Sequence, residues 1–133
     1  MQTTSVPNNF TLSTGWTSQT STYANTQTVV PRIATSTQGS SISFPLEFAS
    51  AFYIVGSVNY NHGAFDVTVT PTPNIGSQLN GVYNGSSRWI GLDTMLYLAT
   101  GLNRTQTYQI EMTNVSPGRW LDVSSVVILD TTP

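Results

Sequence analysis

The chain has no cysteine, no lysine and a single histidine, and these shortages exclude several classes of function. Without cysteine it can form neither disulfides nor thiolate metal sites. Only 8% of its 133 residues are charged and the formal net charge is -2, so it lacks the basic stripe that binds nucleic acid. No hydrophobic run approaches the ~20 residues that a membrane-spanning helix needs. We therefore expect no nucleic-acid partner and no membrane insertion.

Hydroxyl side chains take the place of the missing charges, with 21 Thr and 16 Ser. The low charge and an aromatic content of 11% argue against disorder, and Thr, Tyr and Val favour strands. The length suits one domain. We predict a single β-rich domain over 1–133, with a polar Ser/Thr-rich part at 1–40 and the main strands in 41–129. The Ser/Thr-rich, lysine-free composition also indicates a secreted or cell-surface protein.

Alternating apolar residues predict a series of strands. "AFYIVGSV" (51–58) is nearly continuously apolar, as expected of a central strand. No segment has a helical period, and strands separated by turns indicate an all-β, antiparallel jelly-roll β-sandwich. "SISFPLEF" places on one face Ile42, Phe44, Leu46 and Phe48. Further strands are expected at 28–35, where Pro31 indicates an edge or a bulge, and at 64–70, 79–83, 94–100, 105–113 and 120–129.

The turns of such a sandwich divide between its two ends. If successive strands are antiparallel, the turns at 59–63, 84–91 and 114–119 share one end, and those at 71–78 and 101–104 share the other. Loops gathered at one end of a rigid sandwich commonly form the binding site, and the glycines in these turns would leave room for a ligand. The candidate binding residues at the first end are Tyr60, Asn61, His62, Asn84, Arg88, Trp89 and Arg119.

His62, the single histidine, lies in the turn "NYNHG". Catalysis would need a nucleophile and an orienting partner, and the sequence has no G-x-S-x-G elbow. A zinc site would need further His or Cys ligands. In the alternative reading, Asn61, His62 and Gly63 form a polar turn that the imidazole caps. We predict that His62 is neither a catalyst nor a metal ligand, and we expect no catalytic residues and no bound metal.

The six carboxylates show no pair suited to acid/base hydrolysis. Asp66 and Glu111 fall on outward strand positions. Asp93 and Asp122 could meet near the loops, where they could cap turns or hold a structural calcium together with carbonyl groups. We therefore expect no cofactor, with a structural calcium as the one alternative.

Two side chains in the predicted loop end, Trp89 and Arg88, suit a ligand rich in hydroxyls. Trp89 in "SSRWIG" offers a flat face to a sugar ring or a peptide, or else it plugs one end of the core. Arg88 could supply paired hydrogen bonds or remain a solvated charge. Trp120 begins a strand and belongs to the core or its rim. Amide, guanidinium and indole groups together favour a glycan or cell-wall polysaccharide as partner.

The leading functional hypothesis is a non-catalytic carbohydrate-binding module or lectin. A structural or adhesive ectodomain that binds another protein is the alternative, followed by an accessory domain of a glycoside hydrolase. The sequence carries four glycosylation sequons, against about three expected by chance from ten Asn and this Ser/Thr content. Their number is therefore no evidence of secretion. The acceptor residues, which would make the chain a glycoprotein, are Asn9, Asn84, Asn103 and Asn114.

The stretch from 53 to 113, with "GSVNYNHGAFDVTV", "YNGSSRW", "LYLATGL" and "TYQIEMTN", resembles a domain of extracellular fungal proteins. These are galactose-binding-domain-like β-sandwiches, often the ectodomain of single-span surface proteins. The likeness covers roughly the last two-thirds of the chain and ends in "LDVSSVVI". It implies a jelly-roll sandwich, secretion or surface display, and glycan binding. It identifies no catalytic residues.

Overall fold

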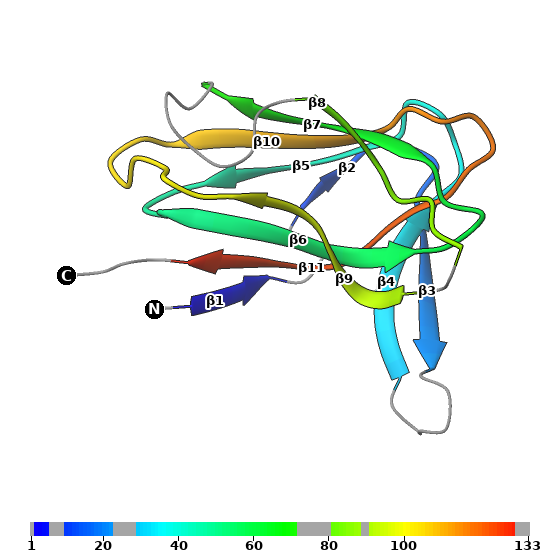
Figure 1. The fold of residues 1–133 in the computed structure, drawn as a ribbon. Coiled ribbons are helices and arrows are strands. Elements are labelled where there is room, and N and C mark those ends of the chain that lie inside the picture. Colours follow the sequence, from blue (N-terminus) through cyan, green and yellow to red (C-terminus); the bar gives the residue numbers. More distant parts are fainter. Residues whose placement is uncertain (1, 6–9, 23–28, 72–80, 89–90, 130–133) are drawn as a thin grey trace.

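The structure, a computed structural model, describes residues 2–5, 10–22, 29–71, 81–88 and 91–129. These residues form eleven β-strands and no helix, arranged as two sheets that face each other (Figure 1). In this part of the chain no helix is long and apolar enough to cross a membrane. The all-β sandwich predicted from the sequence is confirmed.

Sheet A contains six strands: β1 (Gln2–Ser5), β3 (Thr17–Thr22), β4 (Val29–Thr35), β6 (Ala51–Val58), β9 (Gly91–Ala99) and β11 (Leu121–Leu129). They run in the order β3-β4-β11-β6-β9, and β1 pairs with β11. Strand β11 pairs with β6 on one side. On its other side it pairs first with β4 and then with β1. It is therefore the central strand that joins the polar N-terminal part to the rest of the sheet.

Sheet B contains five strands: β2 (Thr11–Leu12), β5 (Ser41–Leu46), β7 (Ala64–Thr70), β8 (Gly81–Asn84) and β10 (Tyr108–Asn114). Their order is β2-β5-β10-β7-β8, and all neighbouring strands are antiparallel. The strands predicted from position 41 onward are confirmed to within a few residues at their ends, except that residues 79 and 80 of the predicted strand 79–83 lie outside the described residues. Within the polar segment 1–40, the alternation had indicated only β4, whereas β1, β2 and β3 also form.

The core lies between the two sheets and is filled by their alternating inward side chains. Residues such as Phe52 and Ile54 of sheet A face Val67 and Ile110 of sheet B, all at most 1% exposed. The predicted inward faces of 64–70 and 105–113 are thus confirmed. Neighbouring aromatic rings, with centroids 4.9–6.0 Å apart, run through the core in the order Phe10, Phe44, Phe52, Tyr97, Tyr83 and Phe65.

Phe48 departs from the predicted pattern. The alternation placed it on the inward face with Leu46, but β5 ends at Leu46 and Phe48 is 65% exposed. Its φ of 57° lies in the left-handed region, which a bulky side chain rarely adopts. The left-handed residue interrupts the alternation as the chain leaves sheet B for β6 of sheet A.

Two irregularities in sheet A shape its surface near β4 and β11. Pro31 pairs with Thr20 of β3, but β11 reaches only Ile33–Thr35, so the proline lies where β4 has a neighbour on one side only. This confirms the predicted edge position. The β3–β4 ribbon consequently extends past the sandwich (Figure 1). In β11 the register shifts between Val123 and Ser125, a bulge that lets Val123 and Val126 both reach the core.

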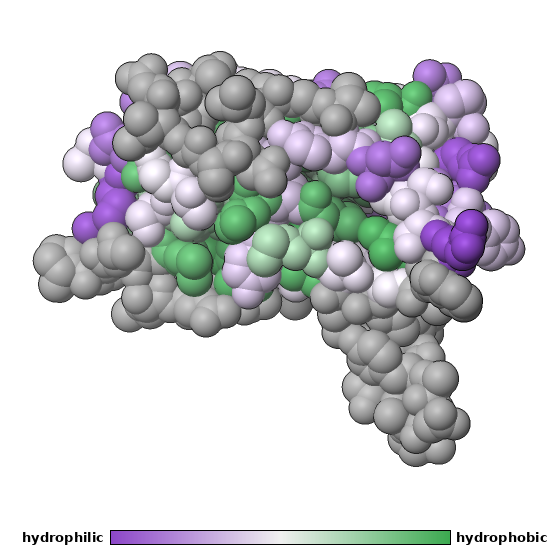
Figure 2. Space-filling model, in the orientation of Figure 1, coloured by the Kyte–Doolittle hydropathy of each residue, from purple (hydrophilic) through white to green (hydrophobic). Residues whose placement is uncertain are grey.

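The visible surface separates into an apolar middle and polar ends. Figure 2 shows hydrophobic residues along the middle of this face and the most hydrophilic residues gathered toward the loops at the two ends. On this face the loops therefore carry the most polar of the described side chains.

Candidate functional site

Three loops meet at one end of the sandwich, as the alternation of turns predicted. They are residues 59–63, 84–88 and 115–120, which we call the loop end. Backbone hydrogen bonds connect all three. The Trp120 amide donates to the Asn61 carbonyl at 2.9 Å, and the Gly85 amide donates to the Gly63 carbonyl at 2.9 Å. The loop end is therefore one hydrogen-bonded unit built from segments far apart in the sequence.

Gly63 allows this close approach. A Cβ built on it would lie 2.7 Å from Cβ atoms of both Arg119 and Ser116, closer than real carbon atoms come. At Gly85 the nearest atoms would lie 3.6 Å away, an ordinary contact. The expectation that the glycines leave room for a ligand is wrong for Gly63, because the neighbouring loop already fills that space.

A cavity of about 100 Å³ lies where the loop end meets the outer face of sheet A. Leu121 and Val123 of β11 face the core, so Asp122 between them faces outward. In β4, Ala34 is paired with Asp122 and shares this face. The cavity is lined by Arg32, Ala34, Ser57, Asn59, Asn61, His62, Trp120 and Asp122.

The single histidine forms part of this lining and is buried. His62 Nε2 lies 2.6 Å from Oδ2 of Asp122, and its Nδ1 lies 2.9 Å from Oδ1 of Asn61. The residue is 7% exposed, and Asp122 is 2% exposed. A buried carboxylate needs such a partner, because losing its hydration is otherwise very costly. His62 thus joins the loop end to β11 and does not merely cap an exposed turn.

Arg32 supplies the second partner of the buried carboxylate. Its Nη1 donates to Oγ of Ser57 at 2.8 Å and lies 3.4 Å from Oδ2 of Asp122. Among the residues that line the cavity, two buried side-chain atoms have no hydrogen-bond partner within the described part of the chain: Oδ1 of Asp122 and Nε of Arg32. Buried polar atoms are nearly always satisfied by protein, water or a ligand. Two residues that line the cavity therefore carry one unused acceptor and one unused donor.

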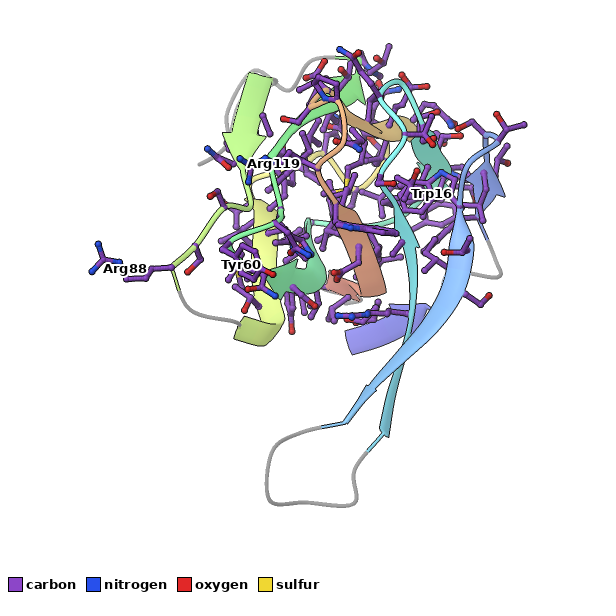
Figure 3. The ribbon with its side chains drawn as sticks, turned by 90° about the vertical axis from the view of Figure 1, so that its right-hand side faces the viewer. Trp16, Tyr60, Arg88 and Arg119 are labelled. Carbon is purple, nitrogen blue, oxygen red and sulfur yellow. The ribbon has the colours of Figure 1, made fainter. Side chains whose placement is uncertain are left out.

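The structure separates the predicted binding residues into groups. Asn61 and His62 line the cavity. Tyr60 is 70% exposed, and its carbonyl accepts a hydrogen bond from Nη1 of Arg119 at 2.7 Å, so these two residues lie next to each other. Arg88 is exposed and points away from the other labelled side chains (Figure 3).

The two remaining predicted residues lie in the segment 84–91. Oδ1 of Asn84 accepts a hydrogen bond from the Ser86 amide at 2.8 Å, which stabilises the local turn. Asn84 itself is exposed. Trp89 lies outside the described residues, so its part in a binding surface stays a prediction.

Several cavity residues were not proposed from the sequence. Arg32 and Ser57 lie within predicted strands, and only the pairing of β4, β11 and β6 brings them beside Asp122. Asp122 was noted only as a carboxylate near the loops, and Trp120 only as a core or rim residue. The apolar alternation of β11 gives the one available signal, since it places Asp122 outward between two core residues.

The described residues contain no group of three or more His, Cys, Asp or Glu side chains placed to hold a metal ion. Within the cavity, Asp122 is the one carboxylate, and the guanidinium of Arg32 lies beside it. A cationic neighbour opposes the binding of a metal cation. The arrangement instead suits a ligand that forms hydrogen bonds.

The glycosylation sequons differ in how accessible their asparagines are. Asn84 and Asn103 are exposed, whereas Asn9 lies outside the described residues. Asn114 is fully buried, and its Nδ2, the atom that would carry a glycan, donates to the carbonyls of Arg119 and Thr37. A glycan on Asn114 does not fit this folded structure, so the expectation of a modification there is corrected.

No known family model matches the chain, and no curated protein matches it. Several solved structures, in contrast, are similar to this chain. A CBM36-1 domain of a xylanase from the hindgut metagenome of Trinervitermes trinervoides has a TM-score of 0.53 and 18% identity, and covers 100% of both chains. A β-1,3-glucan-binding CBM6 from Bacillus halodurans has a TM-score of 0.57 and 13% identity, and covers 96% of this chain and 95% of its own.

A family two carbohydrate esterase from Cellvibrio japonicus has a TM-score of 0.59 at 9% identity, over 98% of this chain. The match spans only 34% of the esterase chain. These likenesses confirm the sandwich fold that the resemblance implied. They do not support a fungal origin, since none of these structures is named as coming from a fungus. The chain has the β-sandwich fold found in carbohydrate-binding modules of the CBM6 and CBM36 families.

Proposed function

We propose that this chain is a non-catalytic carbohydrate-binding domain of a secreted or cell-surface protein, and that it holds its glycan at the loop end. One observation carries the proposal. Two residues of the cavity lining there carry a buried acceptor, Oδ1 of Asp122, and a buried donor, Nε of Arg32, that the described residues leave unpartnered. Sugar hydroxyls both donate and accept hydrogen bonds, so one ligand can satisfy both atoms.

The surroundings of the cavity support a sugar ligand. Asn59, Asn61 and Trp120 line it. The exposed ring of Tyr60 lies on the neighbouring surface. Amides recognise hydroxyls, and aromatic rings cover the apolar C–H faces of a sugar. Trp89, predicted as a further aromatic platform, would extend this surface.

The similar structures support the same ligand class. A CBM6 module of a Cellvibrio mixtus lichenase was solved with cellotriose at 15% identity and a TM-score of 0.52. A CBM36 module was solved with calcium and xylotriose at 16% identity and a TM-score of 0.53. We propose a β-linked plant or microbial polysaccharide as the first class of ligand to examine. We propose that binding needs no cofactor. The binding experiment below also tests whether calcium is required.

The contacts of His62 support a non-catalytic role. Its two ring nitrogens are engaged by Asn61 and Asp122, so the ring has no free nitrogen with which to activate a nucleophile. The nearby Ser57 hydroxyl accepts a hydrogen bond from Arg32, not from the histidine. These contacts favour a structural and binding role for His62.

A glycan array and pull-down with insoluble xylan, cellulose and β-glucan test the proposal. We expect saturable binding to a defined set of glycans, with the same affinity in the presence of calcium and in the presence of a chelator. A blank array at high protein concentration would contradict it and favour an adhesive domain that binds protein. Release of reducing sugar from the same polysaccharides would contradict the non-catalytic role.

A further inference from the structure

We infer that the cavity recognises two adjacent hydroxyls on the edge of a neutral sugar ring. Asp122 accepts a hydrogen bond from one hydroxyl, and Arg32 donates to the other. This inference rests on the proposed function and assigns to it a specific recognition element, which we call the diol site. It consists of Oδ1 of Asp122 and Nε of Arg32.

Oδ1 of the carboxylate and Nε of the guanidinium have no hydrogen-bond partner among the described residues. Oδ2 of Asp122 meets both His62, at 2.6 Å, and Nη1 of Arg32, at 3.4 Å. The same Nη1 donates to Ser57. The polar contacts are thus concentrated on one edge of the carboxylate and one end of the guanidinium. Oδ1 and Nε remain buried and have no hydrogen-bond partner among the described residues.

The charges of the site select a neutral ligand. Arg32 disfavours a bound cation, and the carboxylate of Asp122 disfavours a carboxylate or phosphate. The occupant must supply a donor for Oδ1 and an acceptor for Nε at neighbouring positions. A single hydroxyl reaches one of them well, whereas adjacent ring hydroxyls present two oxygens side by side. A diol that supplies both hydrogen bonds provides what ordered water would otherwise provide to these two atoms.

The size and walls of the cavity limit how much of a ligand enters. About 100 Å³ admits a few water molecules, which suits the edge of one ring and not a folded peptide segment. Ala34 and Trp120 are the apolar residues of the lining. Because His62 is fixed by Asn61 and fixes Asp122, the acceptor is already oriented before the ligand arrives. Such preorganisation reduces the cost of binding.

The composition of the chain provides a direct probe of this site. It has four arginines and no lysine, so the arginine Nε–H region of a ¹H–¹⁵N spectrum contains four side-chain signals. The signal of Arg32 is assigned by its loss in Arg32→Lys. Wild-type protein is then titrated with trans-1,2-cyclohexanediol, with 1,3-cyclohexanediol and with N-methylacetamide, which carries a peptide group.

We expect the Arg32 Nε–H and His62 ring signals to shift with the 1,2-diol and at least about fivefold less at equal concentration with the 1,3-diol, because one hydrogen bond is lost. Methyl β-glucopyranoside should bind at least about tenfold more tightly than its uronic acid. Equal shifts with the two diols would overturn the inference. Larger shifts with N-methylacetamide would overturn it in favour of a peptide ligand.

The inference and the proposed function can fail separately. If a glycan bound on the array leaves the Arg32 signal unmoved, the protein binds carbohydrate but the diol site is wrong. If the array is blank and no diol shifts the signal, both are wrong. Asp122→Asn should weaken binding of an array-positive glycan at least about tenfold. The titrations with wild-type protein decide the question even if that variant does not fold.

Discussion

The imidazole of His62 is hydrogen-bonded to the carboxylate of Asp122 at 2.6 Å, although the two residues lie 60 positions apart in the sequence. One belongs to the loop between β6 and β7, and the other to the central strand of sheet A. The contact fixes the loop over the outer face of that sheet. It also holds the carboxylate in place, so the same pair contributes both to the fold and to the candidate site.

His62→Ala should lower the free energy of unfolding by about 1.5–3 kcal/mol, the range for a hydrogen bond to a charged group. The substitution removes the closest partner of a carboxylate that is 2% exposed. Urea denaturation at neutral pH measures the change. Tyr60→Ala, at an exposed position two residues away, serves as the control and should stay within about 0.5 kcal/mol of the wild type. Equal stabilities of the two variants would contradict a supporting role for His62.

Gly63→Ala should destabilise the protein by about 1–3 kcal/mol, as overpacking does. A Cβ at this position meets the Cβ atoms of Ser116 and Arg119 at 2.7 Å, and these atoms cannot turn aside as the end of a flexible side chain can. Thermal unfolding measures the loss. Gly85→Ala is the matched control in the same loop end, because its Cβ would meet only ordinary contacts, so it should be much less affected.

Tyr60→Ala should weaken glycan binding by about 1–3 kcal/mol, the loss typical of an aromatic contact residue. The ring is 70% exposed at the loop end, where a sugar face can cover it. Phe48→Ala is the control, because Phe48 is an aromatic residue of similar exposure, 65%, in the β5–β6 loop away from the cavity. Titration calorimetry with an array-positive glycan compares them. A larger loss of binding free energy for Phe48→Ala would place the ligand at the opposite end of the sandwich and contradict our proposal.

Tyr97 should make the protein sensitive to alkaline pH. Burial in the core, with a smaller contribution from Tyr83, raises the pKa of Tyr97 from 10.0 to about 12. The folded state therefore favours the neutral phenol. The free energy of unfolding is therefore unaffected by the titration of this group below pH 10. It falls as the pH rises from 10 toward 12, by about 2–3 kcal/mol in all.

Tyr97→Phe should remove this part of the alkaline loss. At neutral pH it should leave stability unchanged or raise it by up to about 1 kcal/mol, because the hydroxyl is buried with no partner among the described residues. Urea unfolding at pH 8, 10 and 11 measures both effects. Tyr60→Phe, at an exposed position, is the control, and its free energy of unfolding should fall with rising pH as steeply as that of the wild type. If the stability of Tyr97→Phe fell as steeply as that of the wild type between pH 8 and 11, the role assigned to Tyr97 would be contradicted.

The main strands and the meeting of the three loops could be predicted because both depend on local signals. Period-two alternation in 64–70 and 105–113 identified the inward faces, and the turns between strands determined which loops share an end. The short strands of the polar segment 1–40 could not be predicted, because Ser and Thr give no apolar alternation. They form because β4, β11 and β5 offer edges with which to pair.

The cavity could be predicted only in part. His62 and Asn61 were proposed because they lie in a turn at the loop end. Arg32 and Ser57 occupy ordinary strand positions, and their place beside Asp122 depends on the register of β4, β11 and β6. A single sequence does not reveal which strands are neighbours across a sheet, so this polar group appears only in the folded chain. Phe48 was placed wrongly because one left-handed residue ended the alternation.

Mapping an array-positive glycan onto the protein by backbone amide shifts tests the central claim most directly. The account predicts that the shifts concentrate in residues 59–63, 84–88 and 115–120 and at Asp122, and that they disappear in Asp122→Asn if that variant keeps the wild-type spectrum elsewhere. Shifts concentrated instead in residues 47–50 and 101–107, with the loop end unmoved, would contradict it.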